Sequence, residues 1–190
     1  MKIEDSGMPD ELYWNSLFDI DGIIDWLNIS EKSRIVEVGS GYGTFTVPIA
    51  GLSQENRLVA FDIEEGMVEI TKGNLASSSL LNVECILRDV MAEKTGLDPE
   101  SVDVVLLFNI LHFSEKRVLL QEASRILKPG GKVAIIHWRK DIPTPRGPSN
   151  ELRPDVAQII SASEGLKLNS NYDSKALGPY HWGIQLYRNP

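Results

Sequence analysis

A short apolar run that passes directly into closely spaced glycines most constrains how this chain folds. Residues 35–44 read Ile-Val-Glu-Val-Gly-Ser-Gly-Tyr-Gly-Thr, with glycines at positions 39, 41 and 43. Ile35, Val36 and Val38 are typical of a buried parallel strand. Glycine is needed where the backbone turns sharply or approaches a ligand closely, because a Cβ atom would collide. The segment predicts a strand, a tight loop and a helix N-terminus that offers N–H groups to a polar small molecule.

A carboxylate ends the next predicted strand. Residues 57–62 read Arg-Leu-Val-Ala-Phe-Asp. An acidic residue about 20 positions after a glycine loop is well placed to accept hydrogen bonds from ribose hydroxyls. The third glycine, however, comes one residue earlier than in the dinucleotide fingerprint, and no second glycine signature follows. The spacing therefore departs from that of a pyrophosphate binder.

Strand and helix patterns alternate from Ser33 onward. The predicted strands are 34–38, 57–62, 83–87, 102–108 and 132–138, and the predicted helices between them are 45–52, 66–75 and 116–127. Ser114 is available as the N-cap of the last of these helices, and Lys128-Pro-Gly-Gly131 is expected to stop it. Such alternation predicts an α/β fold with a parallel sheet and right-handed crossovers.

The two ends of the chain differ from this middle part. Residues 9–29 carry apolar side chains at mostly helical spacing, and Gly22 predicts two helices or a break rather than one continuous helix. Two interpretations stay open for residues 1–30: a helix that covers a sheet edge, or a lid whose aromatic side chains close a pocket. Residues 139–150, here called the Pro/Arg loop, contain three prolines together with Arg139 and Arg146. A helix near 154–163 and strands near 165–171 and 179–188 are expected after it.

Composition sets outer limits on function. A length of 190 residues suits one α/β domain, residues 1–190, and the net charge of −8 argues against broad nucleic-acid binding. The single cysteine, Cys85, rules out an intrachain disulfide and a multi-cysteine metal site, and it is expected to be a small core residue. A cytoplasmic location is the expectation, since no apolar run approaches the roughly 20 residues of a membrane span.

With these motifs in this order, the chain resembles the class I S-adenosylmethionine-dependent methyltransferases from about Ser33 to Arg139. The segments Phe-Asn-Ile-Leu-His-Phe at 108–113 and Lys-Pro-Gly-Gly at 128–131 make it similar to the methyltransferases of ubiquinone and menaquinone biosynthesis. The resemblance implies a Rossmann-like, seven-stranded, mostly parallel sheet with helices on both faces and an antiparallel last strand. The chain lacks the Asn/Asp-Pro-Pro-Tyr/Phe motif of enzymes that methylate amino groups of nucleic-acid bases or protein glutamine.

The resemblance also implies an S-adenosylmethionine site at the carboxyl ends of the strands. Asp62 matches the ligand of the ribose diol, Ile63 and Met67 match residues that pack on adenine, and Asp89 matches the acceptor for the adenine amine. Asn109 matches a position whose backbone contacts the amino-acid end of the cofactor. The full set of matching positions is Glu37, Gly39, Ser40, Gly41, Gly43, Asp62, Ile63, Met67, Asp89, Val90 and Asn109.

Methyl transfer from a sulfonium depends mainly on placement of the acceptor, and a base is needed only for an acceptor that arrives protonated. His112 and His137 are the candidate bases, with His181 as a further histidine, although each can equally be a structural imidazole. The residues expected at the acceptor are His112, Trp138, Arg139 and Arg146. The two arginines could clamp an anionic acceptor, unless the loop that carries them is only a solvated surface loop.

The leading hypothesis is therefore a methyltransferase that moves the methyl group of S-adenosylmethionine to a small molecule by in-line substitution. No resident metal and no nucleic-acid partner are expected. Two alternatives remain: a module that binds S-adenosylmethionine without catalysis, and a nicotinamide-dependent oxidoreductase, which the glycine spacing disfavours.

Overall fold

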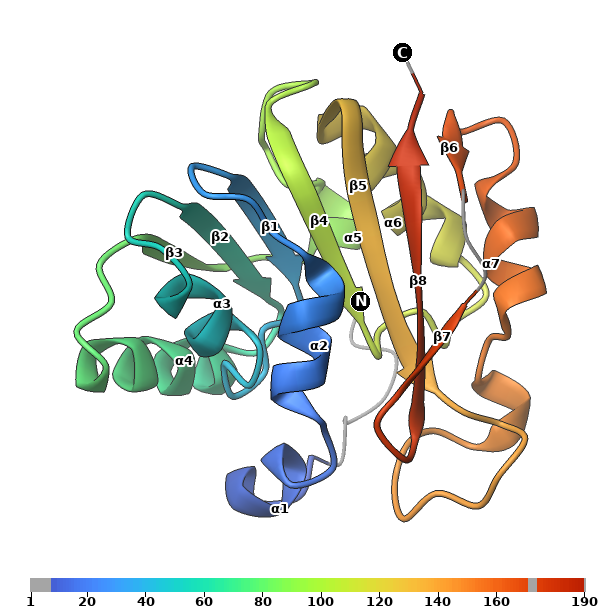
Figure 1. Ribbon diagram of the computed structural model, residues 1–190, viewed down its shortest axis with the longest axis horizontal. Helices are drawn as coiled ribbons and strands as arrows, with labels where there is room; N and C mark the ends of the chain where they lie inside the picture. Colours follow the sequence, from blue (N-terminus) through green and yellow to red (C-terminus); the bar gives the residue numbers. More distant parts are fainter. Residues whose placement is uncertain (1–7, 171–173, 190) are drawn as a thin grey trace.

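The chain folds into a twisted sheet with helices on both faces (Figure 1). The computed structural model describes residues 8–170 and 174–189. Within these residues eight strands pair in the order β3-β2-β1-β4-β5-β8-β6, and β7 also pairs with β8. The first five strands run parallel, whereas β8 is antiparallel to β5. This arrangement confirms the predicted Rossmann-like sheet and its antiparallel last strand. The strands are β1 (Arg34–Val38), β2 (Arg57–Asp62), β3 (Val83–Leu87), β4 (Val102–Phe108), β5 (Leu127–Trp138), β6 (Leu168–Asn169), β7 (Lys175–Leu177) and β8 (His181–Arg188).

Alternating side chains of the central strands supply two separate apolar cores. Ile35 packs with residues of α2 (Ile20–Leu27) and α3 (Thr46–Gly51), and α4 (Glu65–Ser77) contacts α3. The next residue, Val36, points to the other face and packs with residues of α5 (Val90–Glu93), α6 (Lys116–Ile126) and α7 (Val156–Ser163). Because successive side chains of a strand alternate between faces, the same strands contribute side chains to both cores. No helix in the described part of the chain is long and apolar enough to cross a bilayer.

The N-terminal segment breaks earlier than predicted. It forms α1 (Glu11–Asn15) and then α2, and the chain turns between them at residues 16–19. The predicted division into two helices is therefore present, but not at Gly22. Asp19 caps α2 by accepting a hydrogen bond from the Gly22 N–H at 3.1 Å, so Gly22 lies inside this helix. The helix α2 packs on the face of the sheet. The interpretation that this segment covers an edge of the sheet is therefore wrong. Residues 1–7 of the predicted lid lie outside the described residues.

The passage from α6 to β5 also differs from the prediction. Glu115, not Ser114, is the N-cap of α6, and β5 begins at Leu127 directly after the helix. Lys128-Pro-Gly-Gly131 therefore lies within β5, where an irregularity separates the Val102–Leu127 pair from the Val104–Lys132 pair. Cys85 is only partly buried, because β3 is an edge strand with one flank open.

Short elements account for the remaining differences. Neither α5 nor β7 was predicted, and the strand expected at 165–171 is reduced to β6, with Asn171 outside the described residues. The parallel strands all end at one edge of the sheet. Figure 1 shows α1 and the Pro/Arg loop at this same edge, where ligands bind in open α/β sheets.

Candidate functional site

A cavity of about 480 Å³ opens at the carboxyl ends of the parallel strands. Residues from the loops after β1, β2, β3, β4 and β5 line it, as the strand-end argument predicts. Among the described residues, no group of three or more His, Cys, Asp and Glu side chains is arranged to hold a metal ion. The predicted site residues that line this cavity are Gly39, Ser40, Gly41, Asp62, Ile63, Met67, Asp89, Val90, Asn109, His112, Trp138 and Arg146.

The glycine loop forms one wall of the cavity. Gly39 has a φ of +82°, and a Cβ atom there would lie 2.8 Å from Ile110 Cγ2, so that only glycine fits without a shift. The Gly41 N–H donates a hydrogen bond to Asp62 Oδ2 at 2.8 Å, which ties the loop to the end of β2. Gly43 does not line the cavity and packs instead against Thr71 of α4.

Asp62 is held in a fixed orientation beside the cavity. Its Oδ2 accepts from Gly41, and its Oδ1 accepts from the Glu64 N–H at 2.9 Å. Burial raises the pKa of Asp62, while these backbone donors act in the opposite direction. A carboxylate has about four acceptor positions, so both oxygens can still accept from a pair of ribose hydroxyls.

Asp89 is oriented by the short helix α5 that follows it. As the N-cap of α5, its Oδ1 accepts from the N–H groups of Met91 at 3.0 Å and Ala92 at 3.1 Å. Its neighbour Arg88, which sequence reasoning missed, also lines the cavity and donates to the Thr95 carbonyl at 3.0 Å.

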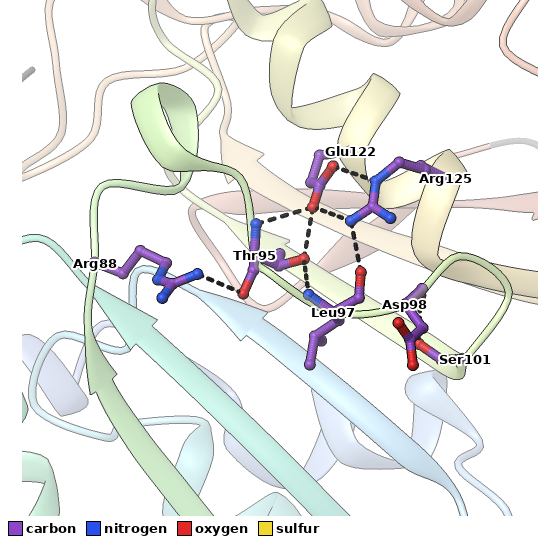
Figure 2. Close-up of polar contacts among 7 residues, drawn as sticks. All are labelled: Arg88, Thr95, Leu97, Asp98, Ser101, Glu122 and Arg125. Carbon is purple, nitrogen blue, oxygen red and sulfur yellow. Dashed lines mark hydrogen bonds and ion pairs between the residues drawn. The ribbon is translucent and has the colours of Figure 1, made fainter.

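A buried carboxylate fixes the segment that holds Arg88 (Figure 2). Glu122 of α6 accepts hydrogen bonds from the Thr95 N–H at 2.9 Å and from its hydroxyl, and it pairs with Arg125 at 2.7 Å. Burial acts to raise the pKa of Glu122, but the hydrogen bonds from Arg125 and Thr95 outweigh it and lower the pKa to about 2. The stability that this carboxylate contributes is therefore full above its ordinary pKa and is lost only as the pH falls toward about 2.

Replacement of Glu122 tests this network. We expect Glu122→Gln to lower the free energy of unfolding by about 2–3 kcal/mol, because a buried charge-assisted network loses its acceptor charge. Urea denaturation at neutral pH measures the effect. Glu69→Gln is the matched control, since Glu69 forms an exposed pair with Lys72 at the same i,i+3 spacing. Equal small losses in both variants would show that the network contributes little.

Buried polar atoms without partners lie next to the cavity. Ser40 Oγ and both side-chain polar atoms of Asn109 are buried and have no hydrogen-bond partner among the described residues. Unpaired buried polar groups are costly, so a ligand that supplies partners is favoured here. The ammonium and carboxylate groups at the amino-acid end of S-adenosylmethionine would supply them, and the ribose would meet Asp62. The chemistry of these residues thus fits the predicted cofactor.

Glu37, at the end of β1, is set back from the cavity surface. It lies beneath the glycine loop, is 1% exposed, and does not line the cavity. Thr46 Oγ1 donates to its Oε2, and burial raises the pKa of Glu37 to about 8. Glu37 thus ties the end of β1 to the start of α3, and its predicted contact with the cofactor stays a prediction.

The other half of the cavity has an aromatic wall, and Trp138, which was predicted at the acceptor, belongs to it. Trp14 of α1 meets Trp138 of β5 edge-on, with ring centroids 6.1 Å apart, and both line the cavity. The position of Trp14 agrees with the interpretation of residues 1–30 as a lid whose aromatic side chains close a pocket. Further apolar lining comes from Met8, Pro9, Phe45, Phe108, Ile110 and Phe113.

Only one of the three histidines lines the cavity. His112 does so, with Nδ1 3.2 Å from the Asn109 carbonyl oxygen. His137 is fully buried on the opposite face of β5 from Trp138, and burial lowers its pKa well below the ordinary value. His181 is also fully buried, stacks on Phe18, and has its pKa lowered to about 3, mainly by burial. The geometry therefore leaves His112 as the candidate base.

The two predicted arginines have separate positions. Arg146 borders the cavity, whereas Arg139 does not line it. The Arg139 guanidinium forms a two-point pair with Asp141, with distances of 3.0 and 2.6 Å. Asp141 thus occupies the group that was expected to bind an anion, and the predicted two-arginine clamp is wrong for this geometry.

Comparison with known proteins adds an independent finding. A family model described as a methyltransferase domain matches residues 35–131. The chain is 32% identical over 128 residues to the uncharacterized methyltransferase-like protein C25B8.10 of Schizosaccharomyces pombe, covering 65% of this chain and 47% of that protein. It is 25% identical over 122 residues to the ubiquinone/menaquinone biosynthesis C-methyltransferase UbiE of Idiomarina loihiensis, covering 63% of this chain and 48% of that protein. The chain thus spans about half the length of these curated relatives.

The same fold occurs in a solved structure of a SAM-dependent methyltransferase from Aquifex aeolicus. The TM-score is 0.81 at 23% sequence identity, and the match covers 94% of this chain and 93% of that one. The family match runs from β1 into β5 and includes the glycine loop, Asp62 and Asp89, which line the cavity. The chain belongs to the methyltransferase domain family, among the class I S-adenosylmethionine-dependent methyltransferases.

Proposed function

We propose that this chain transfers the methyl group of S-adenosylmethionine to a small-molecule acceptor by in-line substitution. The observation that carries the proposal is the fixed carboxylate of Asp62, held between the Gly41 and Glu64 N–H groups at the wall of the cavity. It stands at the strand end where a ribose diol would lie. The unpaired polar atoms of Ser40 and Asn109 support the same orientation of the cofactor.

Placement supplies the main part of catalysis in this proposal. S-adenosylmethionine, when bound, supplies an activated methyl group, and the protein has to hold the acceptor in line with it. Alignment at about 3–3.5 Å can contribute roughly 7–11 kcal/mol to lowering the barrier. The aromatic wall formed by Trp14 and Trp138 limits water in the acceptor half of the cavity. His112 would accept a proton from an acceptor that arrives protonated.

Arg146 favours an acceptor with an anionic group. We expect Arg146→Ala to raise the half-saturating acceptor concentration about tenfold, because one charge-assisted hydrogen bond is lost. The affinity for S-adenosylhomocysteine, measured by calorimetry, is expected to stay within about twofold, since Arg146 belongs to the Pro/Arg loop and is not among the residues predicted to bind the cofactor. Arg139→Ala is the control, because Arg139 belongs to the same loop and does not line the cavity. Unchanged acceptor saturation in Arg146→Ala would rule out a recognition role for this side chain.

Methyl transfer itself is tested with S-adenosylmethionine that carries a labelled methyl group. The protein is incubated with this cofactor and a small-molecule metabolite extract, and labelled products are identified by mass spectrometry. Labelled product is expected with the wild-type chain and not with Asp62→Ala. Binding of S-adenosylmethionine without transfer to any acceptor would favour the non-catalytic module, and binding of a nicotinamide nucleotide instead would favour the oxidoreductase. The predicted cytoplasmic location stays a prediction.

A further inference from the structure

A buried arginine joins the two ends of the Pro/Arg loop. Arg153 follows η1 (Asn150–Leu152) and is only 7% exposed. Its Nη1 donates to the Arg139 carbonyl at 2.7 Å, at the start of the loop. Its Nε donates to the Pro148 carbonyl at 2.8 Å, and its Nη2 donates to the Arg146 carbonyl at 3.2 Å. One guanidinium thus holds three backbone carbonyls that lie up to nine positions apart along the chain.

The same arginine lies against the aromatic wall of the cavity. Its guanidinium carbon is 6.0 Å from the ring centroid of Trp138, within the range of a cation–π contact. The loop backbone also touches this ring, because a Cβ atom on Gly147 would lie 2.8 Å from Trp138 Cγ. Trp138, Arg146, Gly147 and Pro148 all line the cavity, so the contacts of Arg153 fix one part of its wall.

No carboxylate among the described residues pairs with Arg153. The neighbouring Arg139, by contrast, pairs with Asp141. Burial of a guanidinium without a counter-charge is costly, and burial does lower the pKa of Arg153. Arginine is suited to such a place because its planar fork offers donors in several fixed directions, which a lysine ammonium cannot match.

We infer that Arg153 is a positioning residue that fixes the Pro/Arg loop against Trp138 and so shapes the acceptor half of the cavity. Arg153 does not line the cavity itself. It acts through Arg146, Gly147 and Pro148, whose carbonyls or backbone it holds in place. The part of this inference that concerns the acceptor rests on the proposed function, whereas the fixing of the loop does not.

Limited proteolysis tests the fixing of the loop without any need for activity. Trypsin can cut after Arg139, Lys140 and Arg146, and cleavage of a native loop follows the population of its open form. We expect Arg153→Met to be cut at these sites at least about tenfold faster than wild type, with cleavage elsewhere unchanged. Arg153→Lys is expected to fall between the two, because the ammonium keeps the charge and only part of the hydrogen bonding.

Two further variants sharpen the test. Arg117→Met is the control, because Arg117 likewise donates to backbone carbonyls, those of Ala162 at 2.8 Å and Glu164 at 3.0 Å, but is exposed and lies outside the Pro/Arg loop. Gly147→Ala should open the loop while Arg153 stays intact, because the added methyl group meets the Trp138 ring. Equal loop cleavage in wild type and Arg153→Met would overturn the inference, and so would faster cleavage throughout the chain in proportion.

The acceptor half is tested by methyl transfer from labelled S-adenosylmethionine into a graded metabolite extract. In Arg153→Met the half-saturating amount of extract is expected to rise about tenfold, with the maximal rate and the affinity for S-adenosylhomocysteine within about twofold. Arg153→Lys should recover part of this loss. A parallel loss of cofactor affinity would mean a general structural role and would overturn the inference. If wild type transfers no label, the proposed function fails, while the proteolysis result still decides what Arg153 does.

Discussion

Asp62→Ala is expected to weaken S-adenosylhomocysteine binding by at least about 100-fold, because two charge-assisted hydrogen bonds to ribose hydroxyls contribute roughly 1.5–3 kcal/mol each. The substitution also removes the acceptor for the Gly41 N–H, so the glycine loop loses its tie to the end of β2. Isothermal titration calorimetry measures the change. Asp62→Asn is expected to recover little, because its NH₂ group would face one of the two N–H donors.

A carboxylate on the adjacent strand provides the control for this experiment. Glu84 of β3 is exposed and lies outside the cavity lining, so Glu84→Ala is expected to bind the nucleoside as wild type does. Thermal unfolding of Asp62→Ala shows whether its fold is retained. A folded Asp62→Ala variant with wild-type affinity would remove the basis of the proposed cofactor orientation and with it the assignment of the cavity.

Four of the strands could be predicted to the residue because their signals are local and strong. The strands at 34–38, 57–62, 83–87 and 102–108 are short runs rich in apolar residues, as expected of strands in a parallel sheet with helices on both faces. Elements that depend on tertiary contacts were missed. The helix α5 has four residues and begins where Asp89 caps it, and β7 has three residues that pair with β8. Neither is long enough to show a periodic pattern.

The residues of the candidate site likewise include some that the sequence could place and others that it could not. Residues at strand ends, such as Asp62 and Asp89, could be placed because the order of strands decides which edge they share. Strand alternation could also have separated His137 from Trp138, since neighbouring residues of β5 face opposite sides. The roles of Arg153 and Glu122 could not be predicted, because each also binds a distant partner that only the fold brings near. These partners are Arg139, 14 positions from Arg153, and Thr95, 27 positions from Glu122.

Ionisation of Glu37 should have a large effect on stability. It is fully buried beneath the glycine loop, and its Oε1 has no hydrogen-bond partner among the described residues. Burial is the largest cause that raises its pKa from 4.5 to about 8, and the charge of Asp62 adds to the effect while the bond from Thr46 opposes it. A shift of this size corresponds to on the order of 5 kcal/mol between the neutral and charged forms.

The sign of the resulting pH dependence follows from the raised pKa. The stability contributed by neutral Glu37 is full below pH 4.5 and is lost progressively as the pH rises to about 8. Glu37→Gln cannot ionise and can still accept from Thr46, so it should escape this loss. Urea unfolding at about pH 5 and about pH 9 is expected to show the variant gaining several kcal/mol relative to wild type at the higher pH. Exposed Glu84→Gln is the control, and a gap between Glu37→Gln and wild type that stays constant with pH would mean that Glu37 is charged in the folded protein.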